Sequence, residues 1–214
     1  LGVATLIIVM SVMNGFREEL MGKILGVNSH ITIYGQTPQI SNYKDILDKI
    51  NKKQEITRVS SVIENSVMLL SGGNTNGALA KGITLKDLKK KKPIIENIQS
   101  DNLENFDNGN YILLGKDLAR RLGVYIGDSV KVVSPETNST LLGTIPRIKT
   151  YELLGTFKTG MYEYDSSIFF IPLKMAQLQF KYGDSIGSIE VDIKDPERAS
   201  IVAYELQKEL SEDN

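Results

Sequence analysis

The sequence contains no cysteine, which excludes disulfide bonds, zinc–thiolate sites and thiol nucleophiles. It contains one histidine, His30, so a metal site built from several histidines is excluded too. His30 stands at the start of an apparent strand, where we expect a half-exposed structural histidine. The formal net charge of -1 removes the broad positive field with which proteins attract nucleic acid. Thiol chemistry, multi-histidine metal centres and nucleic-acid partners are therefore not expected.

A phosphate-binding loop is also missing. In the nearest match, around LLGKDLA, Asp117 stands where Ser or Thr should bind Mg²⁺, and Asn110 stands where the first glycine belongs. If nucleotide is involved, a partner has to supply its site. Long apolar runs are confined to the N-terminus. After Met13 no stretch approaches the length of a membrane span, so we expect the rest of the chain on one side of any membrane.

The N-terminal run is the first feature that needs explaining. Between Leu1 and Met13 the only polar side chains are those of Thr5 and Ser11. As a helix this stretch is roughly 20 Å long, against about 30 Å for the hydrocarbon core of a bilayer. No basic segment precedes it and no small-residue cleavage site follows, which argues against a signal peptide. We interpret it as the outer half of a transmembrane helix that begins outside this chain. The alternative is a buried N-terminal core helix.

The same helix continues beyond its apolar run. Met13, Phe16, Leu20 and Ile24 recur at helical spacing, and charged residues fill the other faces. This pattern predicts an amphipathic stalk that runs out into water. Gly26 is placed to end it.

The remaining elements predict an α+β fold. Near the N-terminus, the strand pattern HITIY, a helix capped by Ser41 and the strand-like residues 55–71 form a β-α-β unit, and SGGNTNG indicates a hairpin turn after it. Near the C-terminus, GSIEVDI predicts a strand that precedes a helix with Asp195 as N-cap and Pro196 in its first turn. The middle is richer in strands and turns. We therefore predict a layer built from both ends of the chain, with a β-rich insertion between them.

Four segments of the middle region have specific interpretations. YILLGKDLARRLGV predicts a strand and then a helix closed by Gly123. TLLGTIPRIKTYELLGTF predicts two strand-like flanks around Pro146. Residues 97–110 are polar and weakly patterned, so we interpret them as loop. The run Lys89–Lys92 is interpreted as a solvated face, with an approach to anionic lipid as the alternative.

Two motif matches suggest enzymes. GDSIG fits the G-x-S-x-G elbow of serine hydrolases, but Ser185 is followed by a strand pattern rather than a helix, so we interpret it as a turn. The motifs S-x-x-K, S-D-N and K-T-G of penicillin-interacting enzymes occur in order at residues 41–44, 100–102 and 158–160. In that interpretation Ser41 is the nucleophile and Lys44 accepts its proton. The strand and turn pattern after residue 54 argues against that fold, and the serine enzyme is kept as the competing function.

Several segments are characteristic as a set. They are SVMNGFREELMGKILGVNSHITI, NYILLGKDLARRLGVYIGDSVKVVSP, LGTIPRIKTYELLGTF and SSIFFIPLKMAQ, which together cover nearly the whole chain. Together they resemble the LolC/LolE permeases, the membrane subunits of the bacterial lipoprotein-releasing ABC transporter. The first segment is similar to the end of the first transmembrane helix of that family and the start of its periplasmic domain.

The resemblance implies a non-enzymatic subunit in the bacterial inner membrane, with this domain facing the periplasm. In that family two permease subunits pair with two ATPase subunits, which bind ATP and Mg²⁺, and the complex passes lipoproteins from membrane lipid to a periplasmic lipoprotein chaperone. IPLKMAQ and SIGSIEVDI look as much like LolE as LolC, so both a heterodimer and a self-pairing hybrid remain open. A sister MacB-type exporter permease with the same domain plan is a further alternative.

The resemblance also implies a division of the chain. Residues 1–27 are expected to be the end of the transmembrane helix and a stalk. Residues 28–70 and 186–214 are expected to form a porter-like subdomain with a split β-α-β layer. Residues 71–185 are expected to form a β-rich, sabre-like insertion.

Two sets of site residues follow from the resemblance. A chaperone-binding hook is expected at about residues 141–149, with contacts from Gly143, Thr144, Ile145, Pro146 and Arg147. Ile145 is suited to anchor apolarly and Arg147 to bind a carboxylate, while Pro146, which lacks a donor, suits an exposed loop tip. An ordinary wide hairpin is the alternative.

The second set lies in the first helix. Met10, Met13 and Phe16 correspond to the place where the family receives acyl chains, and flexible thioethers suit variable lipid tails. The alternative is packing on a neighbouring helix.

Overall fold

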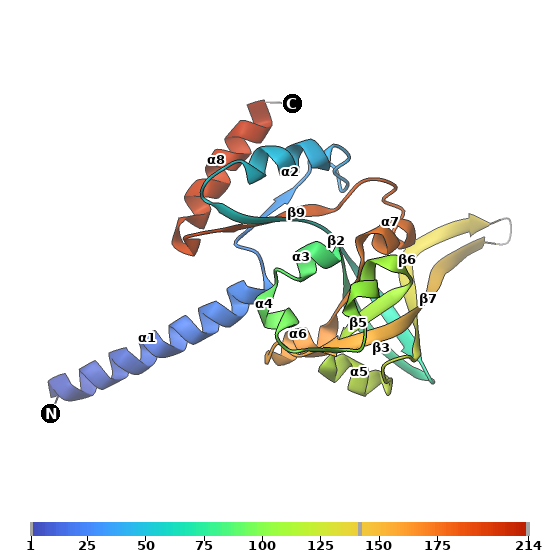
Figure 1. Ribbon diagram of the computed structural model, residues 1–214, viewed down its shortest axis with the longest axis horizontal. Coiled ribbons are helices and arrows are strands. Elements are labelled where there is room, and N and C mark those ends of the chain that lie inside the picture. Colours follow the sequence, from blue (N-terminus) through green and yellow to red (C-terminus); the bar gives the residue numbers. More distant parts are fainter. Residues whose placement is uncertain (1, 141–142, 213–214) are drawn as a thin grey trace.

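The computed structural model of the protein describes residues 2–140 and 143–212, and it has an elongated shape (Figure 1). The helices are α1 (Gly2–Val27), α2 (Tyr43–Asn51), α3 (Leu85–Leu88), α4 (Lys92–Ile95), α5 (Lys116–Leu122), α6 (Tyr162–Ser167), α7 (Leu173–Gln179) and α8 (Ala199–Glu212), with 3₁₀ turns η1 (Leu103–Asn108) and η2 (Pro196–Arg198). The strands are β1 (Ile31–Tyr34), β2 (Ile56–Ser71), β3 (Asn74–Ile83), β4 (Ile98–Ser100), β5 (Tyr111–Gly115), β6 (Ser129–Thr140), β7 (Gly143–Phe157), β8 (Ile168–Pro172) and β9 (Ser188–Ile193).

The first part of the fold is an antiparallel layer in the order β1-β9-β2. Alternation in SIEVDI gives β9 two different faces, because successive side chains of a strand point to opposite sides. Ile189 and Val191 are fully buried in the core that also contains Ile50 of α2 and Val202 and Leu206 of α8. The two helices therefore cover the apolar face of the layer, as Figure 1 shows.

The second part is a closed ring of strands. β2 is 16 residues long, and its second half leaves β9 and pairs with β3 and β6. Among the described residues the pairing continues through β8, β5 and β7 and returns to β6, which closes a ring of six strands. β4 extends it beside β7. The mixed α+β class is confirmed, whereas the porter-like split and its boundaries at residues 70 and 186 stay predictions, since β2 runs through both parts without a break.

Several local predictions can be compared with the structure. The hairpin turn between β2 and β3 is confirmed: Gly72 and Gly73 have φ of 55° and 88°, a region that glycine enters without strain. Gly123, with φ of 68°, closes α5, and the side chain of Asp195 caps the turn that precedes α8. The loop expected over residues 97–110 is wrong, because it contains β4 and η1.

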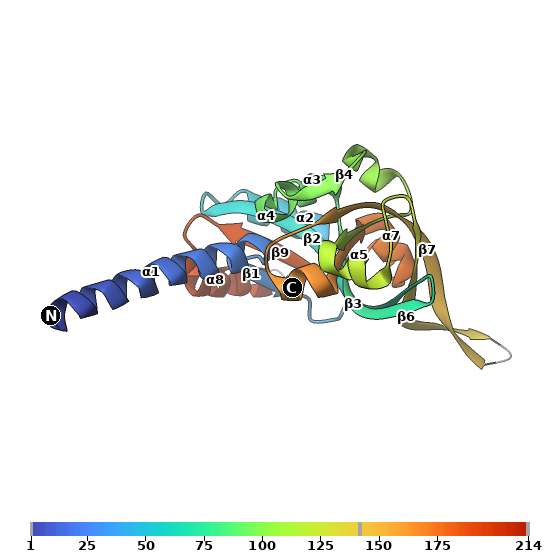
Figure 2. The ribbon, with the colours of Figure 1, turned by 90° about the horizontal axis from the view of Figure 1, so that it is seen from below.

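The helix α1 extends away from the rest of the chain (Figures 1 and 2). Its large apolar side chains from Val3 to Phe16 are exposed, so the alternative of a buried core helix is wrong for this chain. Within the described residues, no helix combines the length and the apolar character required to cross a membrane. The interpretation of its N-terminal half as part of a transmembrane helix therefore stays a prediction.

Gly82 should be required where α7 packs on β3. A Cβ atom at Gly82 would lie 2.2 Å from the Cβ of Ala176, so a Gly82→Ala substitution must push the helix off the strand. We expect this overpacking to lower the free energy of unfolding by about 1–3 kcal/mol, measured by urea denaturation.

Gly77→Ala is the matched control on the same strand, because a Cβ there has nothing within 4 Å. It should leave stability unchanged or raise it by up to about 1 kcal/mol, since alanine lowers the entropy of the unfolded chain. Equal losses in both variants would contradict the packing argument.

Candidate functional site

The β6–β7 hairpin forms an arm that projects from the ring at the end of the molecule opposite α1 (Figures 1 and 2). Lys131–Val133 of β6 pair with β2, but beyond Ser134 the described pairs of β6 are with β7 alone. The register shifts between Ser134 and Thr137, where Pro135 lies in a bulge. A bulge bends the strand that carries it, and a residue without a backbone N–H is tolerated there. The arm therefore begins at this bulge.

The five predicted contact residues of the hook lie on the arm, although their predicted conformation is partly wrong. Gly143 to Arg147 belong to a continuous β7 strand and pair with residues 134–140. Pro146 is exposed, but it pairs with Thr137 in the ribbon instead of forming the tip. Residues 141–142 of the predicted hook lie outside the described residues. The two strand-like flanks expected around Pro146 are in fact one strand.

The root of the arm is fixed by α7. The buried side chain of Gln179 donates from Nε2 to the carbonyl oxygens of Val132 on β6 and Arg147 on β7, each at 3.4 Å. Further along β7, Lys149 Nζ lies 5.6 Å from the centre of the Tyr151 ring. Partial burial and the nearby positive charge of Arg147 lower the pKa of Lys149. A single buried amide thus links both strands of the arm to the body.

The predicted lipid-contact residues are at the other end. Met10, Met13 and Phe16 on α1 are 56%, 61% and 60% exposed, so they are free to contact something outside this chain. The structure brings these three residues together on one helix and separates them from the arm.

A buried charge cluster joins α1 to the body. The Nζ of Lys91 donates to the carbonyl oxygen of Val27, the last residue of α1, at 3.0 Å and to Glu190 Oε2 on β9 at 2.8 Å. Glu190 Oε1 lies 3.3 Å from Lys81 Nζ on β3, which in turn lies 2.6 Å from Glu64 on β2. Lys91 is 1% exposed and Glu190 is 4% exposed. One ammonium group therefore binds the end of the helix and the sheet at once.

Burial and mutual attraction compete in this cluster. Burial opposes ionisation of Glu190, but the charges of Lys91 and Lys81 together outweigh it, so the pKa of Glu190 lies below its ordinary value. Burial likewise opposes the charge of Lys81, yet Glu190 and Glu64 raise its pKa. For Lys91 burial is the stronger effect, and its pKa is lowered despite Glu190. The cluster depends on Glu190 staying ionised.

Two further contacts position the end of α1. A Cβ at Gly26 would lie 2.5 Å from Cγ of Pro93, so only glycine allows the helix to approach α4 this closely. The side-chain amide of Asn28 donates to the hydroxyl of Tyr164 on α6. The connection between α1 and the body is therefore packed as well as charged.

The sequence interpretation missed this cluster. Lys89–Lys92 was expected to be a solvated face, which is correct for three of the lysines and wrong for Lys91. The sequence did contain one signal for the burial of Lys91: it lies three residues from each of the buried Leu88 and Ile94. Glu190 gave no such signal, because an acidic residue in an alternating strand normally faces water.

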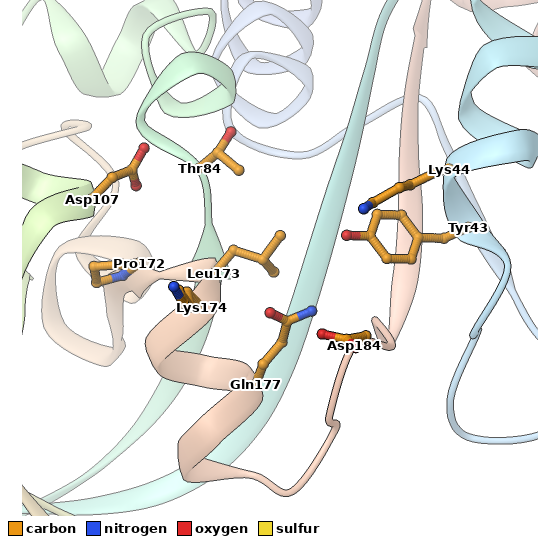
Figure 3. A pocket seen from close by; sticks show the side chains of 9 residues that line it. All are labelled: Tyr43, Lys44, Thr84, Asp107, Pro172, Leu173, Lys174, Gln177 and Asp184. Atoms are coloured by element: carbon orange, nitrogen blue, oxygen red, sulfur yellow. The ribbon is translucent and has the colours of Figure 1, made fainter.

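The structure gives the motif residues of the serine-enzyme alternative other contacts. Ser41 precedes α2, and its Oγ lies 3.1 Å from Oγ of Ser185. Lys44, on α2, borders a cleft of about 350 Å³ together with Tyr43, and α7 forms the opposite wall (Figure 3). Ser100 donates to the carbonyl of Leu154 instead. Since Ser41 lies outside the helix that carries Lys44, the one-turn spacing needed for proton transfer is not formed. Nor does Ser185 begin a helix, because the strand β9 follows it.

Comparison with known proteins now gives this architecture a family. Residues 1–209 match the family described as MacB-like periplasmic core domain. The chain belongs to this family. The core domain is 29% identical over its whole length to the lipoprotein-releasing system transmembrane protein LolC of Neisseria meningitidis, covering 52% of that protein. It is 25% identical over 202 residues to LolE of Haemophilus influenzae, which is 92% of this chain and 48% of LolE.

The fold agrees with the same assignment. The crystal structure of the periplasmic region of MacB from Actinobacillus actinomycetemcomitans matches with a TM-score of 0.57 at 16% identity, over 91% of this chain and 88% of the other. The core domain spans about half the length of the curated relatives it matches. The resemblance to the LolC/LolE family is confirmed. The chain is a periplasm-facing domain of the kind found in ABC transporter permeases.

Removing Lys91 should destabilise the core domain strongly. A Lys91→Met substitution keeps an apolar stem of similar length but leaves Val27 O and Glu190 Oε2 without their buried donor. We expect the free energy of unfolding to fall by about 3 kcal/mol or more in urea denaturation, as found when one partner of a buried ion pair is removed.

Lys89→Met is the matched control from the same lysine run. Lys89 pairs with Glu104 at the surface, where the two side chains are 44% and 73% exposed, so its loss should cost less than about 1 kcal/mol. Similar losses in both variants would show that Lys91 does not connect α1 to the sheet.

The stability of the core domain should depend on Glu190 in acid. Because the pKa of Glu190 in the folded state lies below its ordinary value of 4.5, the unfolded state takes up the proton more readily. The stabilisation from this carboxylate is complete above that value and is lost as the pH falls through the folded pKa. The difference in free energy of unfolding between wild type and Glu190→Gln should therefore shrink between pH 6 and pH 3. A difference that is constant with pH would contradict this assignment.

Proposed function

We propose that this core domain belongs to a permease subunit of an inner-membrane ABC transporter that releases lipoproteins and passes them to a periplasmic chaperone. The names of the relatives support the transport of lipoproteins. The observation that carries the proposal is the position of the arm and α1 at opposite ends of an elongated molecule (Figure 1). If α1 leads to the membrane, the arm reaches away from it, where a soluble partner can approach.

The chemistry of transport is assigned to other subunits. ATP and Mg²⁺ are bound by a partner ATPase subunit, and this domain is not an enzyme. A second permease subunit completes the complex, either a second copy or a related chain. The role of the core domain is mechanical, and it rests on contacts that differ between two states of the complex.

The arm is assigned to the chaperone. In this proposal Gly143, Thr144, Ile145, Pro146 and Arg147 form the contact surface, with Ile145 as an apolar anchor and Arg147 as the partner of a carboxylate. The ribbon supports this role because beyond Ser134 its backbone is held by β6 and β7 alone among the described strands. Such an arm can enter a groove without disturbing the ring.

The exposed side chains of α1 are assigned to lipid. Met10, Met13 and Phe16 are proposed to contact the acyl chains of the lipoprotein or the surrounding lipid. Exposed apolar side chains in such number need a cover in the complete protein, and a lipid phase or another apolar helix supplies one.

A MacB-type exporter permease is the second candidate. It is favoured by the fold that the chain shares with the periplasmic region of MacB. Such an exporter has no need of a lipoprotein chaperone. Binding of the chaperone therefore discriminates between the two functions.

The proposal predicts that the arm is required for binding the chaperone. The double substitution Ile145→Asp with Pro146→Gly removes the apolar anchor and the rigid φ, and it should reduce capture of the purified chaperone in a pull-down at least ten-fold. Tyr204→Asp on α8, at a site 70% exposed, is the control and should bind like wild type. Both variants should keep the wild-type circular dichroism spectrum. Undiminished binding by the arm variant would remove the hook assignment, and no binding by the wild type would favour the exporter.

A further inference from the structure

A second and larger cleft lies beside the end of α1. Its volume is about 800 Å³, within the range of small-molecule sites. The residues that line it come from the α1–β1 link, from α6 and from strands β1, β2, β3, β8 and β9. Asn28 and Ser29, which directly follow α1, form part of its wall. The cleft is therefore placed where the helix enters the body.

The lining of the cleft carries an excess of negative charge. Three carboxylates line it, those of Glu64, Glu163 and Glu190, against the single ammonium of Lys81. Lys91 lies behind Glu190 and supplies a second ammonium. One carboxylate remains in surplus: Glu64 and Glu190 are paired with lysines, whereas the described residues provide no ion pair for the exposed Glu163. A ligand that carries one positive charge matches this arrangement.

Another part of the lining is apolar. Leu79, Met161 and Ile168 line the cleft together with the ring of Tyr164. Ile168 is 7% exposed, while Met161 and Tyr164 are half-buried, so the wall is a preformed surface. Methionine adapts to chains of varied shape. A hydrocarbon chain of several carbons can lie against these side chains while its polar end faces the carboxylates.

We propose that this cleft binds an amphiphile with a primary ammonium group, such as an amine-bearing lipid, with the ammonium at Glu163 and Glu64 and the hydrocarbon on Leu79, Met161 and Ile168. The assignment goes beyond the proposed function and does not require the chain to transport lipoproteins.

The test uses dodecylamine that carries a photoreactive diazirine in its chain, irradiated with the whole chain and mapped by mass spectrometry of peptides. Labelling should concentrate on peptides that contain residues 161–168 and 79–81. Glu163→Gln removes the negative charge with little change in shape and should reduce this labelling at least three-fold, and Glu163→Lys should reduce it further. Labelling of α1 reports non-specific adsorption to its exposed apolar side chains and should be the same in every variant.

Glu152→Gln is the control for removal of an exposed carboxylate elsewhere, on β7, and should label like wild type. A dodecanoic acid probe with the same diazirine should label the cleft peptides at least three-fold less than the amine. The proposal is overturned if the two probes label the cleft equally, if Glu163→Gln labels like wild type, or if labelling is confined to α1.

Discussion

Lys91 holds the last carbonyl of α1 and the carboxylate of Glu190 at one buried point, and the position of α1 relative to the body depends on this contact. An isolated ammonium in such a place would be expelled by the cost of desolvation. The Lys91 ammonium is stable there because Glu190 and the helix carbonyl replace its hydrating water. Glu190 in turn pairs with Lys81, and Lys81 pairs with Glu64, so positive and negative groups alternate through the cluster. The close packing of Gly26 on Pro93 then restricts the direction of the helix.

A chain of paired strands and packed helices connects the Lys91–Glu190 contact to the arm. Glu190 is on β9, which pairs with β2, and β2 passes from the layer into the ring. One hydrophobic core contains residues of α2, α8, the ring strands and α7. α7 in turn holds both strands of the arm through Gln179. A tilt of α1 is therefore expected to carry the body with it, whereas the arm beyond its bulge has fewer restraints.

The sequence is most informative where one short segment determines its own structure. SGGNTNG predicts the β2–β3 hairpin because two glycines accept positive φ, and Asp195 predicts a cap because its side chain reaches a backbone N–H nearby. Closure of the ring was not predictable, since β2 and β6 are far apart in the chain and no local pattern encodes their pairing. The burial of Glu190 was not predictable for a similar reason: alternation in SIEVDI shows two faces, but not that Lys81 and Lys91 lie against the polar one. The residues assigned to the hook by resemblance lie on a projecting segment, but their extended conformation was not predicted.

The prolines of the arm have a consequence for the behaviour of the whole molecule. A two-stranded ribbon exposes two rows of backbone donors and acceptors, which invites fusion with the ribbon of a second copy and, from there, aggregation. Pro146 has no N–H to offer on the β7 edge, and the bulge at Pro135 increases the local twist of the β6 edge. Pairing with a strand from another molecule is therefore disfavoured at both of these points. The arm can thus remain solitary at high protein concentration, which a long, flat ribbon of the same length could not.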